Sequence, residues 1–165
     1  MKFRELTAGE IDVRVQSVKE SGCVLLLYKD ARCDMNMLDE TVGAENWQRR
    51  HYDCKGNLFC SVGIRIDGEW IWKDDCGTES NTEKQKGEAS DSFKRACFNW
   101  GIGRELYTAP FIWIPKENVR INGNKTFDKF SVEKIIIKDG QITALAIRNE
   151  SMKKRVFVWQ QEVKA

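Results

Sequence analysis

The sequence predicts an α+β fold in which three antiparallel strands lead into one helix, a β-β-β-α core. Three strand-like runs follow one another across tight glycine turns, and a helical run at residues 84–107 comes soon after them. Alternating runs at both ends of the chain add an N-terminal hairpin and helix before the core and additional C-terminal strands after it.

The composition is that of one globular domain, expected to span residues 1–165, because 41% of the residues are hydrophobic and 32% are charged. The formal net charge is only +2, so any surface that binds a polyanion must concentrate positive charge locally. Six cysteines without a C-x-x-C pair, and the single histidine, His51, argue against a zinc site. No signal peptide opens the sequence and the longest apolar run, residues 23–28, is too short to cross a membrane, so we expect reduced thiols and a cytoplasmic protein.

The N-terminal part predicts a hairpin followed by a helix. Residues 10–19 alternate apolar and polar side chains, as a half-buried strand does, and residues 23–28 form a more apolar strand after a short turn. Apolar side chains in residues 31–42 recur at spacings of three and four, which predicts an amphipathic helix that ends at Gly43.

The middle of the chain predicts a three-stranded antiparallel meander. Its strands are residues 47–54, 58–66 and 69–76, and Gly56 and Gly68 supply the positive φ that tight hairpin turns require. When a helix covers one face of such a sheet, the other face is left for solvent or a partner.

Residues 84–107 predict a helix with one buried side and one polar side. Thr82 followed by Glu83 predicts its start, and Gly101 with Gly103 predicts its end. The expected apolar stripe is Ala89, Phe93, Ala96, Cys97 and Trp100, and the expected polar face is Lys86, Ser90, Asp91, Lys94 and Arg95.

The C-terminal part predicts mainly strands. The expected segments are a strand at 111–114, a loop at 116–125, a hairpin of 131–138 with 141–148, and a last strand at 156–160. The apolar faces of these strands and of the N-terminal hairpin either complete one larger sheet within the subunit or form an assembly surface between subunits.

The sequence lacks the motifs of common enzyme classes. It has no P-loop and no nucleophile elbow, and Gly101-Ile102-Gly103 follows a helix instead of opening one. Acids near lysines raise a metal-dependent nuclease as an alternative, but Glu83 and Lys86 are spaced E-x-x-K at a helix start, not E-x-K on a strand. We therefore expect no enzyme activity, no cofactor and no bound metal.

Cations and aromatic residues are interleaved along the predicted meander and helix. Cations that follow a phosphate backbone, beside rings that stack on bases, are what sequence-independent single-strand binding requires. Tyr52, Trp70 and Trp72 are the candidate rings; strand alternation places both tryptophans on one face, and core packing is their alternative role. The candidate cations are Arg32, Arg49, Arg50, Lys73, Lys84, Lys86, Lys94, Arg95 and Arg104.

The run K-G-E-A-S-D-S-F-K-R-A, followed by W-G and L-Y, resembles the signature helix of the Rad-fifty-two single-strand annealing family. The resemblance covers residues 31–107, about half of the chain, and includes the upstream N-M-L-D-E-T-V-G and E-N-W. It implies the annealing core of a short phage or bacterial member, without the long C-terminal region of eukaryotic members.

In that family the Lys-Arg pair of the helix contacts the backbone of single-stranded DNA around an oligomeric ring. The resemblance places this pair at Lys94 and Arg95 and a further basic position at Lys86. Eukaryotic members carry another arginine one turn beyond the pair, where this sequence has Phe98. From helical spacing alone, we expect Asp91 to orient both cations by intrahelical pairing.

These observations predict a homo-oligomeric protein, in ring form by the resemblance, that binds single-stranded DNA and anneals complementary strands without ATP in recombination and double-strand-break repair. A single-strand-binding protein or an exonuclease is the expected class of protein partner. The alternatives are a protein of the same fold that protects DNA ends or single strands and, more remotely, the metal-dependent nuclease. The expected DNA-binding residues are Lys94, Arg95, Lys86, Lys84, Arg104, Lys73, Arg32 and Arg49.

Overall fold

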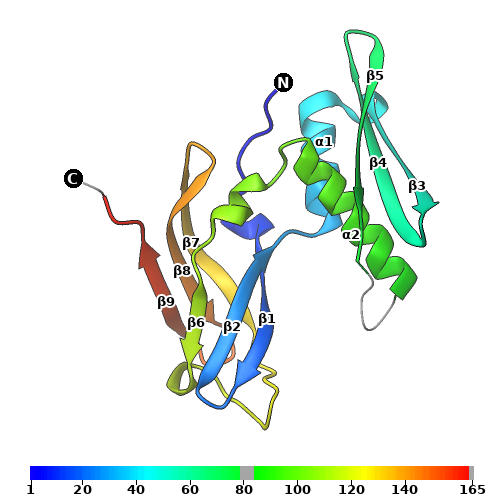
Figure 1. The fold of residues 1–165 in the computed structure, drawn as a ribbon. Coiled ribbons are helices and arrows are strands. Elements are labelled where there is room, and N and C mark those ends of the chain that lie inside the picture. Colours follow the sequence, from blue (N-terminus) through cyan, green and yellow to red (C-terminus); the bar gives the residue numbers. More distant parts are fainter. Residues whose placement is uncertain (79–83, 164–165) are drawn as a thin grey trace. The chain divides into compact units, whose positions relative to one another are not determined.

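The computed structural model describes residues 1–78 and 84–163, with side chains from residue 86 onward in the second range. These residues form two α-helices and nine strands in antiparallel sheets, which confirms the predicted α+β class (Figure 1). The elements are β1 (Asp12–Lys19), β2 (Gly22–Tyr28), α1 (Ala31–Val42), β3 (Trp47–Cys54), β4 (Asn57–Ile66), β5 (Glu69–Cys76), α2 (Lys84–Asn99), β6 (Ile112–Pro115), β7 (Phe130–Lys138), β8 (Gln141–Asn149) and β9 (Lys154–Gln160).

The chain divides into two compact units. The helical unit consists of Met1–Arg4 and Lys29–Gly103, and the sheet unit consists of Glu5–Tyr28 and Arg104–Ala165. The expectation of a single domain stays a prediction. Most of the motif-bearing stretch, residues 31–107, lies in the helical unit.

The helical unit contains the predicted β-β-β-α core. Strands β3, β4 and β5 form an antiparallel sheet in that order, and α2 packs against β4 and β5. Two-residue turns connect the strands, and both central residues of the second turn have positive φ, 51° at Asp67 and 85° at Gly68. Such turns twist with the strands, and the hairpin turns predicted at Gly56 and Gly68 are confirmed.

One face of this sheet, the inner face, supplies the core of the unit. Val62 and Ile64 of β4 and Phe93 of α2 are fully buried. Burying a side chain of this size contributes about 1.5–3 kcal/mol, so the apolar contact between the sheet and α2 stabilises the motif-bearing region. The opposite face of the same sheet is called the outer face below.

Both helices of the unit end where the sequence predicts. Asp30 caps α1 by accepting a hydrogen bond from the Cys33 backbone N–H at 2.8 Å, and Gly43, with φ of 85°, ends it. Helix α2 ends at Asn99, before Gly101 with φ of 98°. The start predicted at Thr82 and Glu83 lies outside the described residues.

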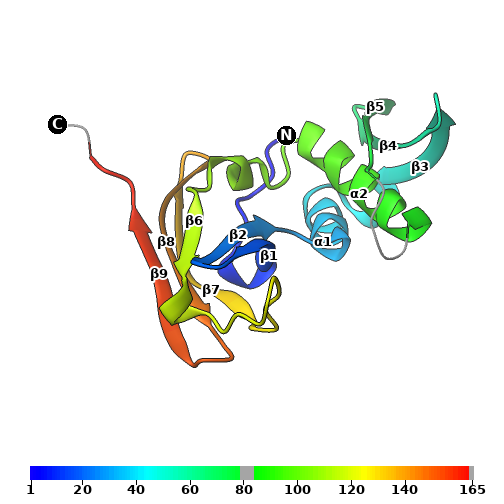
Figure 2. The ribbon, with the colours of Figure 1, turned by 60° about the horizontal axis from the view of Figure 1, so that its bottom comes forward.

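The sheet unit is one six-stranded sheet in the order β6-β2-β1-β7-β8-β9. The N-terminal hairpin and the C-terminal strands therefore belong to one sheet within the chain, which confirms the first of the two alternatives left open by the sequence. The edge strands β6 and β9 approach each other, so the sheet is strongly curled (Figure 2). Leu25, Ile114, Leu145 and Ile147 are among the buried side chains of its core.

Four cysteines, Cys23, Cys33, Cys60 and Cys97, are buried apolar residues. Cys23, Cys60 and Cys97 have no exposed surface. Burial raises the pKa of the Cys23 and Cys60 thiols to about 11, and it also raises the pKa of Cys97 well above its ordinary value. These three thiols stay protonated at neutral pH and pack as small apolar side chains. In the described part of the chain, neither helix is long and apolar enough to cross a bilayer.

Candidate nucleic-acid interface

Helix α2 has a buried side and two polar flanks. Phe93, Ala96 and Cys97 of the predicted apolar stripe are fully buried, and the ring of Phe93 stacks on Trp47 with centroids 6.0 Å apart. The flank toward α1 carries Lys86, Ser90 and Lys94, because residues four apart share a helix face. The flank toward β5 carries Asp91 and Arg95.

Positive charge gathers in a hollow on the α1 flank, here called the basic hollow. Strand alternation turns Arg49 and His51 toward the same face of the sheet as α2. Both side chains are exposed, as is Lys86 across from them. The hollow is lined by Ala31 and Met35 of α1, Arg49 and His51 of β3, and Lys86, Ala89 and Ser90 of α2.

Two contacts hold the strand side of the basic hollow in place. The guanidinium carbon of Arg49 lies 4.6 Å from the centroid of the Phe93 ring, within the range of a cation–π interaction. The Nε2 atom of His51 lies 3.1 Å from the carbonyl oxygen of Ala89, so this nitrogen carries the hydrogen. Groups fixed before binding lose less conformational entropy when a ligand arrives. The hollow is thus suited to an anion such as a phosphate.

A buried ion pair supports the backbone of α2 at Lys94. The Nζ atom of Lys29 lies 2.5 Å from Oδ1 of Asp34 and 3.4 Å from the carbonyl oxygen of Lys94. Lys29 is 1% exposed and Asp34 is fully buried, so each buried charge is stabilised by the opposite charge of its partner. Removing one partner of such a pair costs about 3–5 kcal/mol. This pair fixes the position of α2 relative to the start of α1.

The same pair lies beside the phenylalanine at position 98. The Nζ atom of Lys29 lies 4.1 Å from the centroid of the Phe98 ring. An arginine at position 98 would place a second cation beside this buried ammonium group. Burial raises the pKa of the Asp34 carboxyl group to about 6, although the charge of Lys29 acts in the opposite direction. One carboxylate oxygen, Oδ2 of Asp34, has no hydrogen-bond partner in the described residues.

The β5 flank of α2 is tied to its strand. The Nε atom of Arg95 lies 3.4 Å from Oδ1 of Asp75, and both side chains are partly exposed. Lys73 donates a hydrogen bond to the Asn99 carbonyl oxygen at 3.0 Å, and its Nζ atom lies 4.7 Å from the Trp100 ring centroid. Lys73 and Arg95 therefore lie on this flank and not in the basic hollow. An exposed ion pair is worth only about 0–1 kcal/mol, so a phosphate can compete for Arg95.

Asp91 connects α2 to the end of β5. Its Oδ2 atom accepts hydrogen bonds from the backbone N–H and the hydroxyl group of Thr78 at 3.0 and 3.2 Å. The carboxylate that pairs with Arg95 belongs to Asp75. The orienting role expected for Asp91 stays a prediction.

The structure brings together only some of the residues that the sequence predicts to bind DNA. Arg49 and Lys86 meet in the basic hollow. Arg32 is exposed on α1, and Arg104 belongs to the sheet unit. Helix α2 begins at Lys84, whose side chain lies outside the described part.

Sequence reasoning missed several residues of this region. At the level of sequence, His51 is only a possible metal ligand, although strand alternation places it on the same face of β3 as Arg49. Asp75 and the pair Lys29–Asp34 carry no sequence signal, because their partners lie on other elements. In residues 1–78 and 84–163, no group of three or more histidine, cysteine, aspartate or glutamate residues could hold a metal ion.

Comparisons with known proteins give one informative similarity. The chain is similar to the single-stranded DNA-binding protein DdrA of Deinococcus radiodurans, with 28% identity over 106 residues. The matched stretch is 63% of this chain and 50% of DdrA, so the chain matches about half the length of this curated relative. No family model matches the chain, and no solved structure matches it.

Proposed function

We propose that this protein binds single-stranded DNA through the basic hollow and α2, and anneals complementary strands without a nucleotide cofactor. The observation that carries the proposal is the meeting of Arg49, Lys86 and His51 on one side of α2. The similarity to a single-stranded DNA-binding protein supports the choice of ligand. The resemblance of the α2 sequence to the Rad-fifty-two annealing family supports the choice of activity.

The chemistry of annealing fits such a surface. Base pairing supplies the free energy, so the protein needs no covalent step. It must hold a strand by its phosphates while the bases stay accessible. Arginine and lysine side chains at a helix and strand surface do this without reading sequence, and their contribution weakens as salt rises.

The small number of cations in each chain favours an assembly. With a net charge of only +2, one subunit offers a short run of phosphate contacts. Identical subunits arranged side by side multiply these contacts by multivalency. We propose a homo-oligomer, in ring form by analogy with the annealing family. The edge strand β9, where Val158 is 67% exposed, is a candidate surface for subunit pairing.

One incubation separates this function from its alternatives. A labelled single strand is mixed with its complement and the protein, with and without magnesium, and a nuclease is then added to part of each sample. Faster duplex formation without magnesium or nucleotide supports annealing. A strand protected from the added nuclease without faster pairing indicates a protecting protein. Fragments that appear only with magnesium indicate a metal-dependent nuclease and refute the proposal.

A further inference from the structure

The outer face of the β3–β4–β5 sheet differs in composition from the inner face. Strand register places the side chains of Arg50, Tyr52, Phe59, Trp70, Trp72 and Asp74 on it. Among the described residues of these strands, the outer face has no valine, leucine, isoleucine or methionine, whereas the inner face carries Val62 and Ile64. It is therefore a surface of flat rings and cations.

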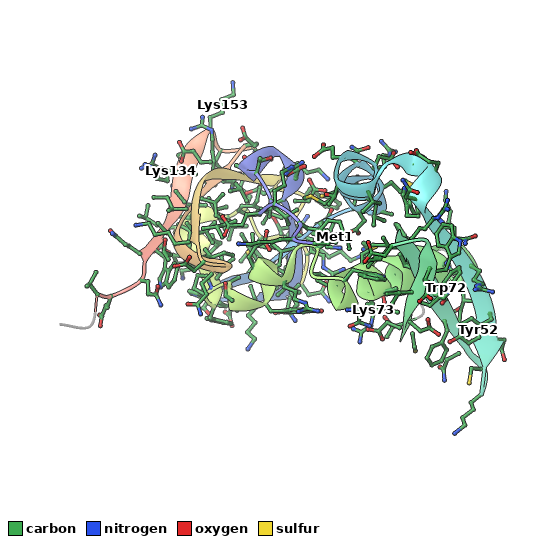
Figure 3. All side chains as sticks on the ribbon, turned by 90° about the horizontal axis from the view of Figure 1, so that it is seen from above. Met1, Tyr52, Trp72, Lys73, Lys134 and Lys153 are labelled. Atoms are coloured by element: carbon green, nitrogen blue, oxygen red, sulfur yellow. The ribbon has the colours of Figure 1, made fainter. Side chains whose placement is uncertain are left out.

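The planar groups of the outer face pack against one another, stacked at Tyr52–Phe59 and tilted by 31° at Trp70–Trp72. The Tyr52 and Phe59 rings lie 5.5 Å apart at an interplanar angle of 22°. The Trp70 and Trp72 rings lie 6.2 Å apart, and the Arg50 guanidinium carbon lies 3.7 Å from the Trp72 ring centroid. Tyr52 and Trp72, labelled in Figure 3, come from the two edge strands of the sheet, β3 and β5.

A glycine allows one of these rings to lie against the sheet. A Cβ atom at Gly63 would lie 2.8 Å from the Trp72 ring, which is closer than Cβ atoms approach other heavy atoms in proteins. The ring of Trp72 is half-buried in this position, with the Arg50 guanidinium over it. Trp70 and Tyr52 keep 38% and 39% of their surface exposed. These rings therefore remain accessible to a ligand.

The one carboxylate on the outer face is already occupied. Asp74 accepts hydrogen bonds from the Tyr52 hydroxyl group at 2.6 Å and from the Ser61 hydroxyl group at 2.5 Å. Its two oxygens hold the tyrosine and the strand in place. The outer face also carries two exposed arginines, Arg50 and Arg65, against the single carboxylate of Asp74. Its net charge is therefore positive and favours an anionic partner.

We propose that the outer face stacks the unpaired bases of single-stranded nucleic acid. The proposal rests on the proposed single-strand binding and adds a second contact surface to the basic hollow. Exposed rings and guanidinium planes on a sheet can stack two or three bases, and the arginines pair with the phosphates between them. The outer face carries two exposed arginines, and its one carboxylate is already hydrogen-bonded to Tyr52 and Ser61, so its charge matches the phosphates of a nucleic acid.

The test separates stacking from charge. The Tyr52→Leu/Trp70→Leu double variant removes the exposed rings and keeps every cation. Binding is measured by fluorescence anisotropy with labelled oligo(dT), and with an abasic oligonucleotide of the same length and charge. We expect a loss of affinity for oligo(dT) of roughly fivefold or more per ring, and no change for the abasic strand. The slope of log affinity against log salt should stay the same, because no phosphate contact is removed.

Two further variants serve as controls. Tyr52→Phe/Trp70→Phe keeps the rings and should bind oligo(dT) within about twofold of the wild type, even if the leucine variant does not fold. Phe127→Leu removes an exposed ring from the sheet unit and should leave binding unchanged.

Other outcomes overturn the inference. Unchanged affinity of the folded leucine variant for oligo(dT) excludes the outer face from the site. Equal weakening on both strands shows that the rings act without stacking. A changed oligomer mass with unchanged affinity assigns the face to contact between subunits. If the wild type does not bind oligo(dT) at all, the proposed function is wrong. If the wild type binds oligo(dT) and the folded leucine variant binds it equally well, only the inference about the outer face is wrong.

Discussion

Removing the two predicted cations of the basic hollow should weaken single-strand binding in a way that depends on salt. The change is the Arg49→Gln/Lys86→Gln double variant, since both side chains line the hollow. Each lost phosphate contact lowers the slope of log affinity against log salt by about 0.7, so the double variant should lose about 1.4.

The size of the effect follows from that slope. If both proteins bind equally at about 1 M salt, the variant should bind about 14-fold more weakly at about 0.15 M and about 65-fold more weakly at about 0.05 M. A fold loss that grows as salt falls distinguishes lost phosphate contacts from a general loss of structure. The cation–π contact of Arg49 with Phe93 adds a stability cost of about 0.5–1 kcal/mol, which thermal unfolding can measure.

The assay is anisotropy of labelled oligo(dT) across a salt series. The charge-preserving Arg49→Lys/Lys86→Arg variant should keep the wild-type slope. Lys134→Gln/Lys153→Gln removes two positive charges from the sheet unit (Figure 3) and should change the slope little. An unchanged slope in the folded Arg49→Gln/Lys86→Gln variant would refute the assignment of the basic hollow as the phosphate site.

Three other predictions concern charge, pH and assembly. Asp75→Asn releases Arg95 from its 3.4 Å ion pair and removes a negative charge, so it should strengthen oligo(dT) binding, and weaker binding would show that the pair itself is needed. The pKa of Asp34 is raised from 3.8 to about 6, so its contribution to folding is present at low pH and lost as pH rises through about 6. Between pH 7 and 4 the wild type should therefore gain about 2 kcal/mol in free energy of unfolding relative to Asp34→Asn, which has no carboxyl group at position 34 to titrate. Equal pH profiles of the two proteins would contradict this. Light scattering at micromolar concentration should show an oligomer without DNA, and Val158→Lys on β9 should lower its mass; a 19.1 kDa monomer with and without oligonucleotide would refute assembly.

Much of the fold could be predicted because its signals are local. Glycine turns between alternating runs gave the β3–β5 meander, and helical spacing gave the buried stripe around Phe93. The division into two units could not be predicted, since it depends on which distant strands pair. Strand β1 meets β7 through the Asp12–Ser131 register, more than a hundred residues apart in the chain.

The candidate site was only partly predictable for the same reason. Arg49 and Lys86 could be proposed as cations, but only the packing of α2 against the β3–β4–β5 sheet brings them together. Lys94 and Arg95 are adjacent in sequence, yet they lie on different flanks of α2, and Arg95 pairs with Asp75 of β5. A pair that depends on two elements leaves no periodic pattern in the sequence.

The measurement that tests the central claim most directly is a competition between DNA forms. The protein is bound to labelled oligo(dT) at low salt and titrated with unlabelled single strand or with duplex of the same length. The account predicts that the single strand displaces the label at a clearly lower concentration than the duplex, and that rising salt weakens the complex. Absence of binding to oligo(dT), or displacement by duplex at equal or lower concentration, would contradict a single-strand site in this protein.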